Sequence, residues 1–178
     1  MYRLALDYLI EWKTRESRKP VVIRGARQVG KSYLVRMLAD AEFSNVLEVN
    51  FEQTPGLASL FASKSAKTII SQLEARFDAS IVPGETLLFL DEIQAVPDVL
   101  PALRYLYEEM PELHVACAGS LLEFVLAEHS FSMPVGRIEY LHLGPMQFEE
   151  FLLAMNRPKL RQWLCEFALG DPVPGEIH

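Results

Sequence analysis

One short stretch decides the fold of this chain, Gly25-Ala26-Arg27-Gln28-Val29-Gly30-Lys31-Ser32. It matches the pattern G-x-x-x-x-G-K-[ST], in which glycines let a loop curl so that successive backbone N–H groups point at phosphate oxygens. The β-branched run before it, residues 20–24, indicates a buried strand, and residues 31–40 have the apolar spacing of a helix. A strand, a glycine loop and a helix in this order predict a phosphate-binding loop in an α/β domain.

The loop residues have expected contacts with a nucleotide. Lys31 would reach the β- and γ-phosphate oxygens as a point charge, and the Ser32 hydroxyl would ligate Mg²⁺. Arg27 and Gln28 either contact phosphate or face solvent. The alternative for the whole stretch is a glycine turn with a chance lysine, against which the flanking strand and helix argue. The residues expected to hold the nucleotide are Gly25, Ala26, Arg27, Gln28, Val29, Gly30, Lys31, Ser32 and Tyr33.

A second run, Thr86 to Leu90, is the most apolar in the chain and ends at two acids, Asp91 and Glu92. Parallel α/β sheets bind ligands at the carboxyl ends of their strands, so Asp91 is expected to hold Mg²⁺. Glu92 would orient or deprotonate a water that attacks the γ-phosphate. The alternative for Glu92 is a helix cap or a solvated acid at a strand end.

Two further candidates follow later strands. Ser120 comes after a strand predicted at 114–118, and its hydroxyl would hydrogen-bond the γ-phosphate or the attacking water. The N-cap of a helix predicted over 121–128 explains Ser120 equally well. Arg137 would neutralise charge on the transferring phosphate, from its own chain or from a neighbouring subunit. A solvated or ion-paired arginine is the alternative.

The remaining pattern predicts strands that alternate with helices. We expect strands at 46–51 and 138–143 and helices at 57–63, 66–77, 97–110 and 146–155, with an amphipathic helix over 2–14. This alternation predicts a three-layer αβα sandwich with a mostly parallel central sheet. We divide the chain into an N-terminal helix and basic linker (1–19), a core (20–155), and a C-terminal helix with a linker toward a further domain (156–178).

Composition limits the function classes. Half of the 178 residues are apolar, and the net charge is −7, which argues against nonspecific nucleic-acid binding by the whole chain. Residues 1–36 hold nine basic and three acidic side chains, so the basic charge is concentrated near the loop. The two cysteines have no ligand spacing, and neither a signal peptide nor a membrane-spanning run is expected. We therefore expect a cytoplasmic protein without a membrane partner.

Taken in order, five motifs resemble the N-terminal ATPase domain of a widespread prokaryotic AAA-like family whose members carry a C-terminal domain of unknown function. They are residues 24–32 (a Walker A loop), 90–94 (the end of a Walker B strand), 118–122, 136–137 and 143–151. The resemblance implies a P-loop NTPase fold of the additional-strand, AAA-like type, with the loop strand flanked by the Asp91 strand and the 114–118 strand. It also implies ATP or ADP with Mg²⁺ as cofactors, Ser120 as a polar sensor, and Arg137 as an arginine finger or sensor.

Several functions share these motifs. The first hypothesis is a Mg²⁺-dependent ATPase, a hydrolase, that drives a conformational change in an attached or partner module. A nucleotide-gated interaction switch with little turnover is the alternative. A small-molecule kinase is disfavoured because residues 125–150 contain one arginine only. A homo-oligomer, and a protein or DNA target reached through the expected C-terminal domain, stay open, as does base specificity.

Overall fold

The computed structural model describes residues 2–96, 98–120, 134 and 136–170. The chain forms two compact units. The larger one spans Ala5–Pro145, and the smaller one combines Met1–Leu4 with Met146–His178. Among the described residues, no helix is long and apolar enough to cross a membrane.

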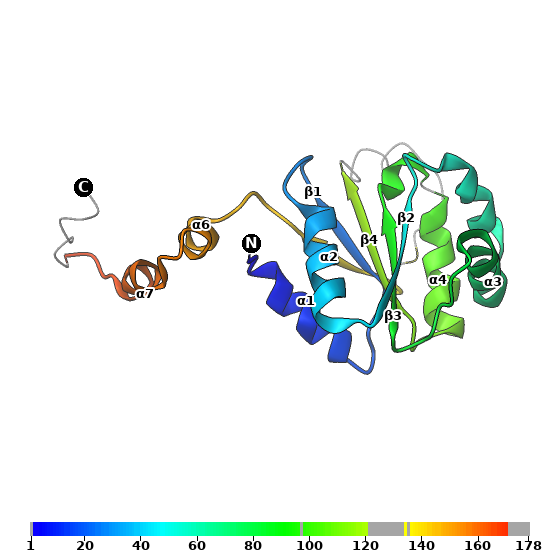
Figure 1. Ribbon diagram of the computed structural model, residues 1–178, viewed down its shortest axis with the longest axis horizontal. Helices are drawn as coiled ribbons and strands as arrows, with labels where there is room; N and C mark the ends of the chain where they lie inside the picture. Colours follow the sequence, from blue (N-terminus) through cyan, green and yellow to red (C-terminus); the bar gives the residue numbers. More distant parts are fainter. Residues whose placement is uncertain (1, 97, 121–133, 135, 171–178) are drawn as a thin grey trace. The chain divides into compact units, whose positions relative to one another are not determined.

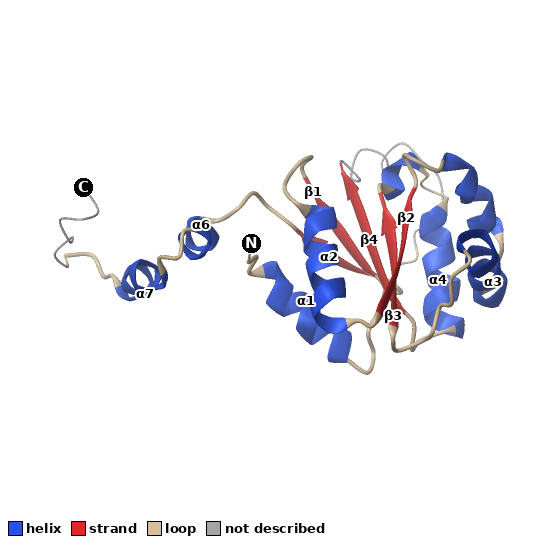
Figure 2. Ribbon diagram, viewed as in Figure 1, coloured by secondary structure: helices blue, strands red, loops and turns tan. Residues whose placement is uncertain are grey.

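The larger unit is built on five parallel strands in the order β2-β3-β4-β1-β5 (Figure 2). Their bounds are β1 Val21–Gly25, β2 Asn45–Asn50, β3 Thr86–Asp91, β4 His114–Ser120 and β5 Glu139–His142. Each lies within two residues of a strand expected from the sequence. All residues of β3 and β4 are buried, as central strands require. β2 and β5 contain exposed residues and form the two edges of the sheet.

The order of the strands corrects one expectation. The loop strand β1 does not lie beside the Asp91 strand β3; its neighbours are β4 and β5. β4 lies between β1 and β3 and pairs with each of them. Ala118 of β4 is opposite Ile23 of β1, and Cys117 of β4 is opposite Leu90 of β3. The small residues of β4 let helices on both faces pack closely over this central strand.

Helices cover both faces of the sheet in the larger unit (Figure 1). On one face α1 (Ala5–Thr14) and α2 (Lys31–Glu42) pack against alternate strand residues that include Val21, Ile23 and Phe89. On the other face α3 (Ala66–Phe77) and α4 (Val99–Glu109) cover the residues between them, such as Val22, Leu88 and Cys117. Because neighbouring strand residues point to opposite faces, each of the inner strands β1, β3 and β4 contributes to two cores. The result is the expected three-layer αβα arrangement of a P-loop NTPase.

Two helix predictions need comment. The segment expected as a helix at 57–63 is a 3-10 helix, η1 (Pro55–Ala62). Pro55 stands in its first turn and Gly56, a weak helix former, follows, which favours a short, tightly wound turn over an α-helix. The helix expected at 121–128 lies outside the described residues.

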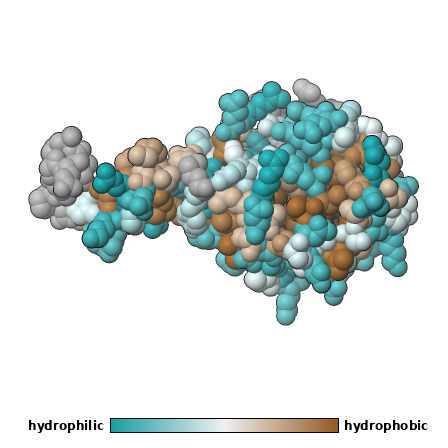
Figure 3. Space-filling view, in the orientation of Figure 1, coloured by the Kyte–Doolittle hydropathy of each residue, from teal (hydrophilic) through white to brown (hydrophobic). Residues whose placement is uncertain are grey.

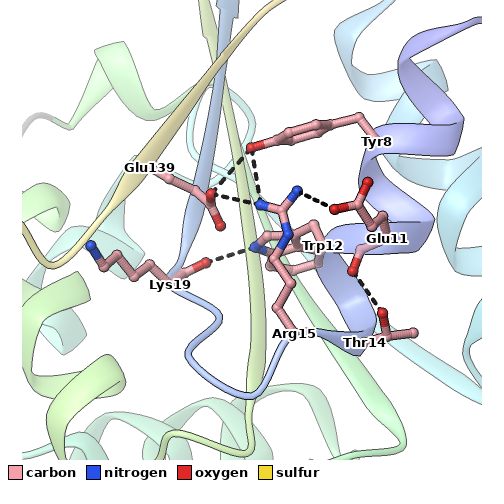
Figure 4. A network of polar contacts seen from close by, with 7 residues as sticks. All are labelled: Tyr8, Glu11, Trp12, Thr14, Arg15, Lys19 and Glu139. Atoms are coloured by element: carbon pink, nitrogen blue, oxygen red, sulfur yellow. Dashed lines mark hydrogen bonds and ion pairs between the residues drawn. The ribbon is translucent and has the colours of Figure 1, made fainter.

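Hydrogen bonds fix α1 and the basic linker to the sheet (Figure 4). Tyr8 Oη donates to Glu139 Oε2 on β5 at 3.1 Å, and Arg15 bridges Glu139 and Glu11 at 3.3 and 3.1 Å. The fully buried Trp12 donates from Nε1 to the Lys19 carbonyl at 2.8 Å. The N-terminal helix therefore belongs to the same compact unit as the strands.

The smaller unit contains α6 (Phe148–Ala154) and α7 (Pro158–Glu166). The buried Glu150 organises it, because its carboxylate accepts from the Arg3 guanidinium at 3.0 Å and from the backbone N–H of Leu4 and Gln147. Burial alone would raise the pKa of Glu150, but these donors hold it below its ordinary value. Phe148, Phe151 and Met155, in α6 and at its end, are exposed apolar side chains. Figure 3 shows brown surface over this part of the chain.

Candidate functional site

The loop after β1 has a backbone that only glycine can supply at its two ends. Gly25 has φ 150°, and a Cβ there would lie 2.1 Å from the Leu143 carbonyl oxygen. Gly30, with φ 92° and ψ 29°, is left-handed and caps the N-terminus of α2. Because α2 begins at Lys31, the backbone N–H groups of its first turn lie at the loop. The local sequence thus forms the predicted strand–loop–helix unit.

The Lys31 side chain is buried within the loop. Its ammonium donates to the carbonyls of Gly25 and Ala26 at 3.1 and 2.8 Å and to the Ser120 hydroxyl at 2.9 Å. Burial lowers the pKa of Lys31 below its ordinary value, although the nearby charges of Glu92 and Asp91 act in the opposite direction. Lys31 and Ser120, 89 residues apart, are therefore in direct contact.

Ser32 and Asp91 also meet. The Ser32 hydroxyl donates to Asp91 Oδ1 at 3.0 Å, and the Asn50 amide donates to Asp91 Oδ2 at 3.4 Å. Burial raises the pKa of the Asp91 carboxyl above its ordinary value, and the charge of Glu92 adds to this, while the bond from Ser32 acts against it. A hydroxyl, an amide and a buried carboxylate are thus gathered at the carboxyl ends of β2 and β3.

Glu92 adopts an unusual backbone conformation. Its φ of 54° and ψ of 45° are left-handed, which is costly for a residue other than glycine and is typical of functional sites. This turn ends β3 at Asp91 and brings the next side chain to the same cleft. The cleft has a volume of about 350 Å³ and is lined by Arg27, Gln28, Gly30, Lys31, Ser32, Tyr33, Glu52, Glu92 and Ser120.

Sequence reasoning assigned no role to two polar residues at this edge, Asn50 and Gln94. The Gln94 amide donates to Glu92 Oε2, and its oxygen accepts from the Ser120 backbone N–H at 2.9 Å. Asn50 ends β2, and Gln94 lies in the short 3-10 helix η2 (Ile93–Ala95) that follows β3. Their signal was available, because each is a polar residue at or just beyond the carboxyl end of an expected strand.

The loop residues between the two glycines divide into two groups. Arg27 is exposed at the rim of the cleft and pairs with Glu52 at 3.6 Å, whereas Val29 packs against the core under α2. Ala26 and Gln28 are exposed, and Gln28 is left-handed with φ 64°. Arg27 and Gln28 therefore face the cleft from its open side.

Comparison with known proteins now identifies the domain. A family model described as an AAA domain matches residues 17–152. The chain belongs to this AAA domain family. Among curated proteins no match was found. One similar solved structure is that of C. elegans PCH-2, with 10% identity and a TM-score of 0.45 over 98% of this chain and 49% of that one. The chain thus spans about half the length of that protein chain.

Within the AAA domain, Arg137 lies apart from the other predicted site residues. Arg137 precedes β5, and Glu139 of β5 is opposite Val21, so Arg137 lies at the edge of the sheet where β1 starts. The phosphate loop lies at the other edge, where β1 ends. The five residues of β1 separate the two edges by about 16 Å. Arg137 instead pairs with Glu108 of α4 at 2.7 Å, and this hydrogen bond holds the pKa of Glu108 below its ordinary value.

The residues present fit a magnesium ion. Ser32 and Asp91 offer a hydroxyl and a carboxylate oxygen at hydrogen-bonding distance from each other, which is the oxygen chemistry that Mg²⁺ prefers. Among the described residues, no group of three His, Cys, Asp or Glu side chains is gathered that could hold a metal ion alone. This composition matches Mg²⁺ sites in which one or two protein ligands are completed by phosphate and water.

Proposed function

We propose that this AAA domain binds ATP with Mg²⁺ in the cleft and hydrolyses the β–γ phosphoanhydride bond. One observation carries the proposal: Lys31 and Ser32, at the N-terminus of α2, line the same cleft, and the Ser32 hydroxyl donates to the buried Asp91 carboxylate directly behind it. An ammonium, helix N–H groups and an oxygen ligand pair together suit a polyphosphate with its cation.

Binding would depend first on Lys31. Its three hydrogen-bond acceptors, two carbonyls and the Ser120 hydroxyl, keep the ammonium at the base of the loop. The terminal phosphates would replace some of these acceptors, and the charge-assisted hydrogen bonds gained would be stronger than those lost. The backbone N–H groups of the loop and of the first turn of α2 would hold the remaining phosphate oxygens.

Ser32 and Asp91 would hold the magnesium ion, the hydroxyl as a ligand and the carboxylate directly or through water. When bound, Mg²⁺ supplies charge neutralisation on the β- and γ-phosphate oxygens. The amide of Asn50 would keep the second carboxylate oxygen of Asp91 oriented, since it already donates to that oxygen.

Hydrolysis would use Glu92. Its carboxylate lines the cleft and would accept a proton from a water whose oxygen forms a bond to the γ-phosphorus. The bond from that phosphorus to the β–γ bridging oxygen breaks, and ADP leaves with its electron pair. Lys31 would stabilise the developing charge, and the Ser120 hydroxyl would contact the γ-phosphate or the water.

We also propose that the bound nucleotide drives a conformational change in an attached or partner module. Support comes from Ser120, which ends the central strand β4 and touches Lys31. Loss of the γ-phosphate on hydrolysis would alter the contact between Ser120 and Lys31 and move the end of β4. Arg137, on the opposite edge of the sheet, would reach a nucleotide only in a neighbouring subunit.

Calorimetric titration with Mg²⁺-ATP and Mg²⁺-ADP tests the binding step. The wild-type chain should bind with micromolar affinity, and Lys31→Ala should abolish it. Lys67→Ala, which removes an exposed lysine from the first turn of α3, is the matched control and should bind like wild type.

Phosphate release by the same samples tests the second step. Steady release from wild type without an added acceptor supports the ATPase. Tight binding without release would instead support the nucleotide-gated switch. An absence of binding to the wild-type chain would overturn the proposal.

A further inference from the structure

Gln94 connects two groups that the proposed reaction uses. Its side-chain amide N–H donates to Glu92 Oε2, while its side-chain oxygen accepts from the Ser120 backbone N–H at 2.9 Å. Glu92 and Ser120 are 28 residues apart in sequence and belong to different segments, one after β3 and one at the end of β4. One side chain thus ties the carboxylate to the neighbouring strand.

The Glu92 carboxylate needs such a support. The residue lies outside β3, in a left-handed conformation, and caps a 3-10 helix of only three residues. A carboxylate that must meet one water molecule loses efficiency when its position varies by about 1 Å. The bond from Gln94 restricts the rotamers of Glu92 and keeps its second oxygen free for another partner.

We infer that Gln94 is a positioning residue that holds the Glu92 carboxylate in its water-activating place by anchoring it to the Ser120 backbone, an inference that rests on the proposed function. The half-buried Gln94 suits this task, because its amide both donates to the carboxylate and accepts from the backbone. A carboxylate at this position would accept from Ser120 but would not donate to Glu92, and an apolar side chain would do neither.

The contacts around Ser120 extend this role to the phosphate site. Lys31 donates to the Ser120 hydroxyl, and the Ser120 N–H donates to Gln94, which donates to Glu92. The contacts form one continuous path from the phosphate-binding ammonium to the water-activating carboxylate. A shift of Ser120 when phosphate binds would therefore reach Glu92 through Gln94.

A purely structural role is the competing explanation. Gln94 would then only satisfy the Ser120 N–H, which would otherwise lack a partner at the end of a buried strand. Gln94→Glu keeps the acceptor for Ser120, loses the donor for Glu92 and sets a second negative charge beside that carboxylate, so a wild-type rate in this variant counts against the positioning role. The two roles also differ in a Glu92→Gln background, in which a residue that acts through the Glu92 carboxylate has nothing left to position.

The experiment measures ATP affinity and single-turnover hydrolysis for Gln94→Met and Gln94→Glu, alone and combined with Glu92→Gln. Each single Gln94 variant should lower the hydrolysis rate about 10-fold or more and change the ATP dissociation constant less than about 3-fold. Added to Glu92→Gln, neither should lower the rate further. Gln162→Met is the matched control, since the exposed Gln162 also donates to a carboxylate, that of Glu166, at 2.9 Å.

Each outcome decides between the roles. A wild-type rate in Gln94→Glu, or additive losses in the double variants, would overturn the positioning role. If Gln94→Met unfolds, Gln94→Glu and its double variant with Glu92→Gln still give the answer, and thermal unfolding identifies such a case. If wild type releases no phosphate, the proposed function fails; if wild type hydrolyses ATP and the Gln94 variants match it, only this inference fails.

Discussion

Ser32 and Asp91 lie 59 residues apart in sequence, yet the serine hydroxyl donates to the aspartate carboxylate at 3.0 Å. The contact joins the first turn of α2 to the last residue of β3. In the same way Lys31 reaches Ser120 at the end of β4. An ammonium, two hydroxyls and two carboxylates are thereby gathered where three parallel strands end.

Asp91→Asn should weaken the dependence of nucleotide binding on magnesium. The amide keeps the size of the side chain but removes the negative charge that favours a divalent cation. We expect the apparent affinity for Mg²⁺ in the presence of ATP to fall about 10- to 100-fold. Titration of Mg²⁺ at fixed ATP, followed by phosphate release, measures this change. An unaltered Mg²⁺ requirement would remove Asp91 from the metal site.

Glu92→Gln should separate binding from hydrolysis. The amide cannot take a proton from water, so turnover should fall about 10²- to 10⁴-fold while ATP affinity is retained. Glu112→Gln, which changes an exposed glutamate just before β4, is the matched control. Turnover of Glu92→Gln at the wild-type rate would show that another group activates the water.

Arg137→Ala tests whether a neighbouring subunit completes the site. Arg104 is the matched control, because both arginines pair with the carboxylate of Glu108, at 3.1 Å for Arg104 and 2.7 Å for Arg137. If Arg137 contacts the nucleotide of another copy, its loss should lower turnover up to about 10³-fold, and wild-type turnover per chain should rise with protein concentration. Equal rates for Arg137→Ala and Arg104→Ala would contradict an arginine finger.

Gly25→Ala should destabilise the larger unit. The new Cβ would meet the Leu143 backbone oxygen at 2.1 Å, so β1 or the segment after β5 would have to move. We expect a loss of about 3 kcal/mol in the free energy of unfolding, measured by urea denaturation. Gly56→Ala is the control, because a Cβ there meets nothing within 4 Å. A Gly25→Ala variant as stable as this control would contradict the close approach.

His114 should make stability depend on pH. It is buried against the rings of Trp12 and Phe43, and its Nε2 lies 3.3 Å from the Lys13 carbonyl. Burial lowers its pKa from 6.5 to about 4, and the positive charges of Arg18 and Lys13 act in the same direction. Between these values the unfolded chain binds a proton that the folded chain does not. The free energy of unfolding should therefore fall as pH decreases from 6.5 toward 4, by at most about 3 kcal/mol.

The variant His114→Gln isolates this contribution, because carboxylates titrate in the same range. The difference between wild type and variant in urea denaturation should change across this pH interval and level off above it. His142→Gln, which removes an exposed histidine at the end of β5, serves as the control. A difference that is constant with pH would mean that His114 does not titrate on unfolding.

Local sequence alone was sufficient for the five strands and for the loop. The glycines at 25 and 30 and the helix that begins at Lys31 follow from the allowed backbone angles and from residues adjacent in the chain. The strand that ends at Asp91 was recognisable because a strand buried on both faces is continuously apolar. The three-layer fold follows from the alternation of such strands with helices.

Tertiary structure decided which strands are neighbours and which side chains touch. The position of β4 between β3 and β1 depends on packing over both faces of the sheet, which no single segment encodes. That position brings Ser120 to Lys31 and Gln94, and it leaves Arg137 at the opposite edge. A hydrogen bond requires atoms to lie within about 3 Å, whereas a sequence pattern places a residue only on an element or at its end. The contact between Glu92 and Gln94 is therefore fixed by the tertiary structure.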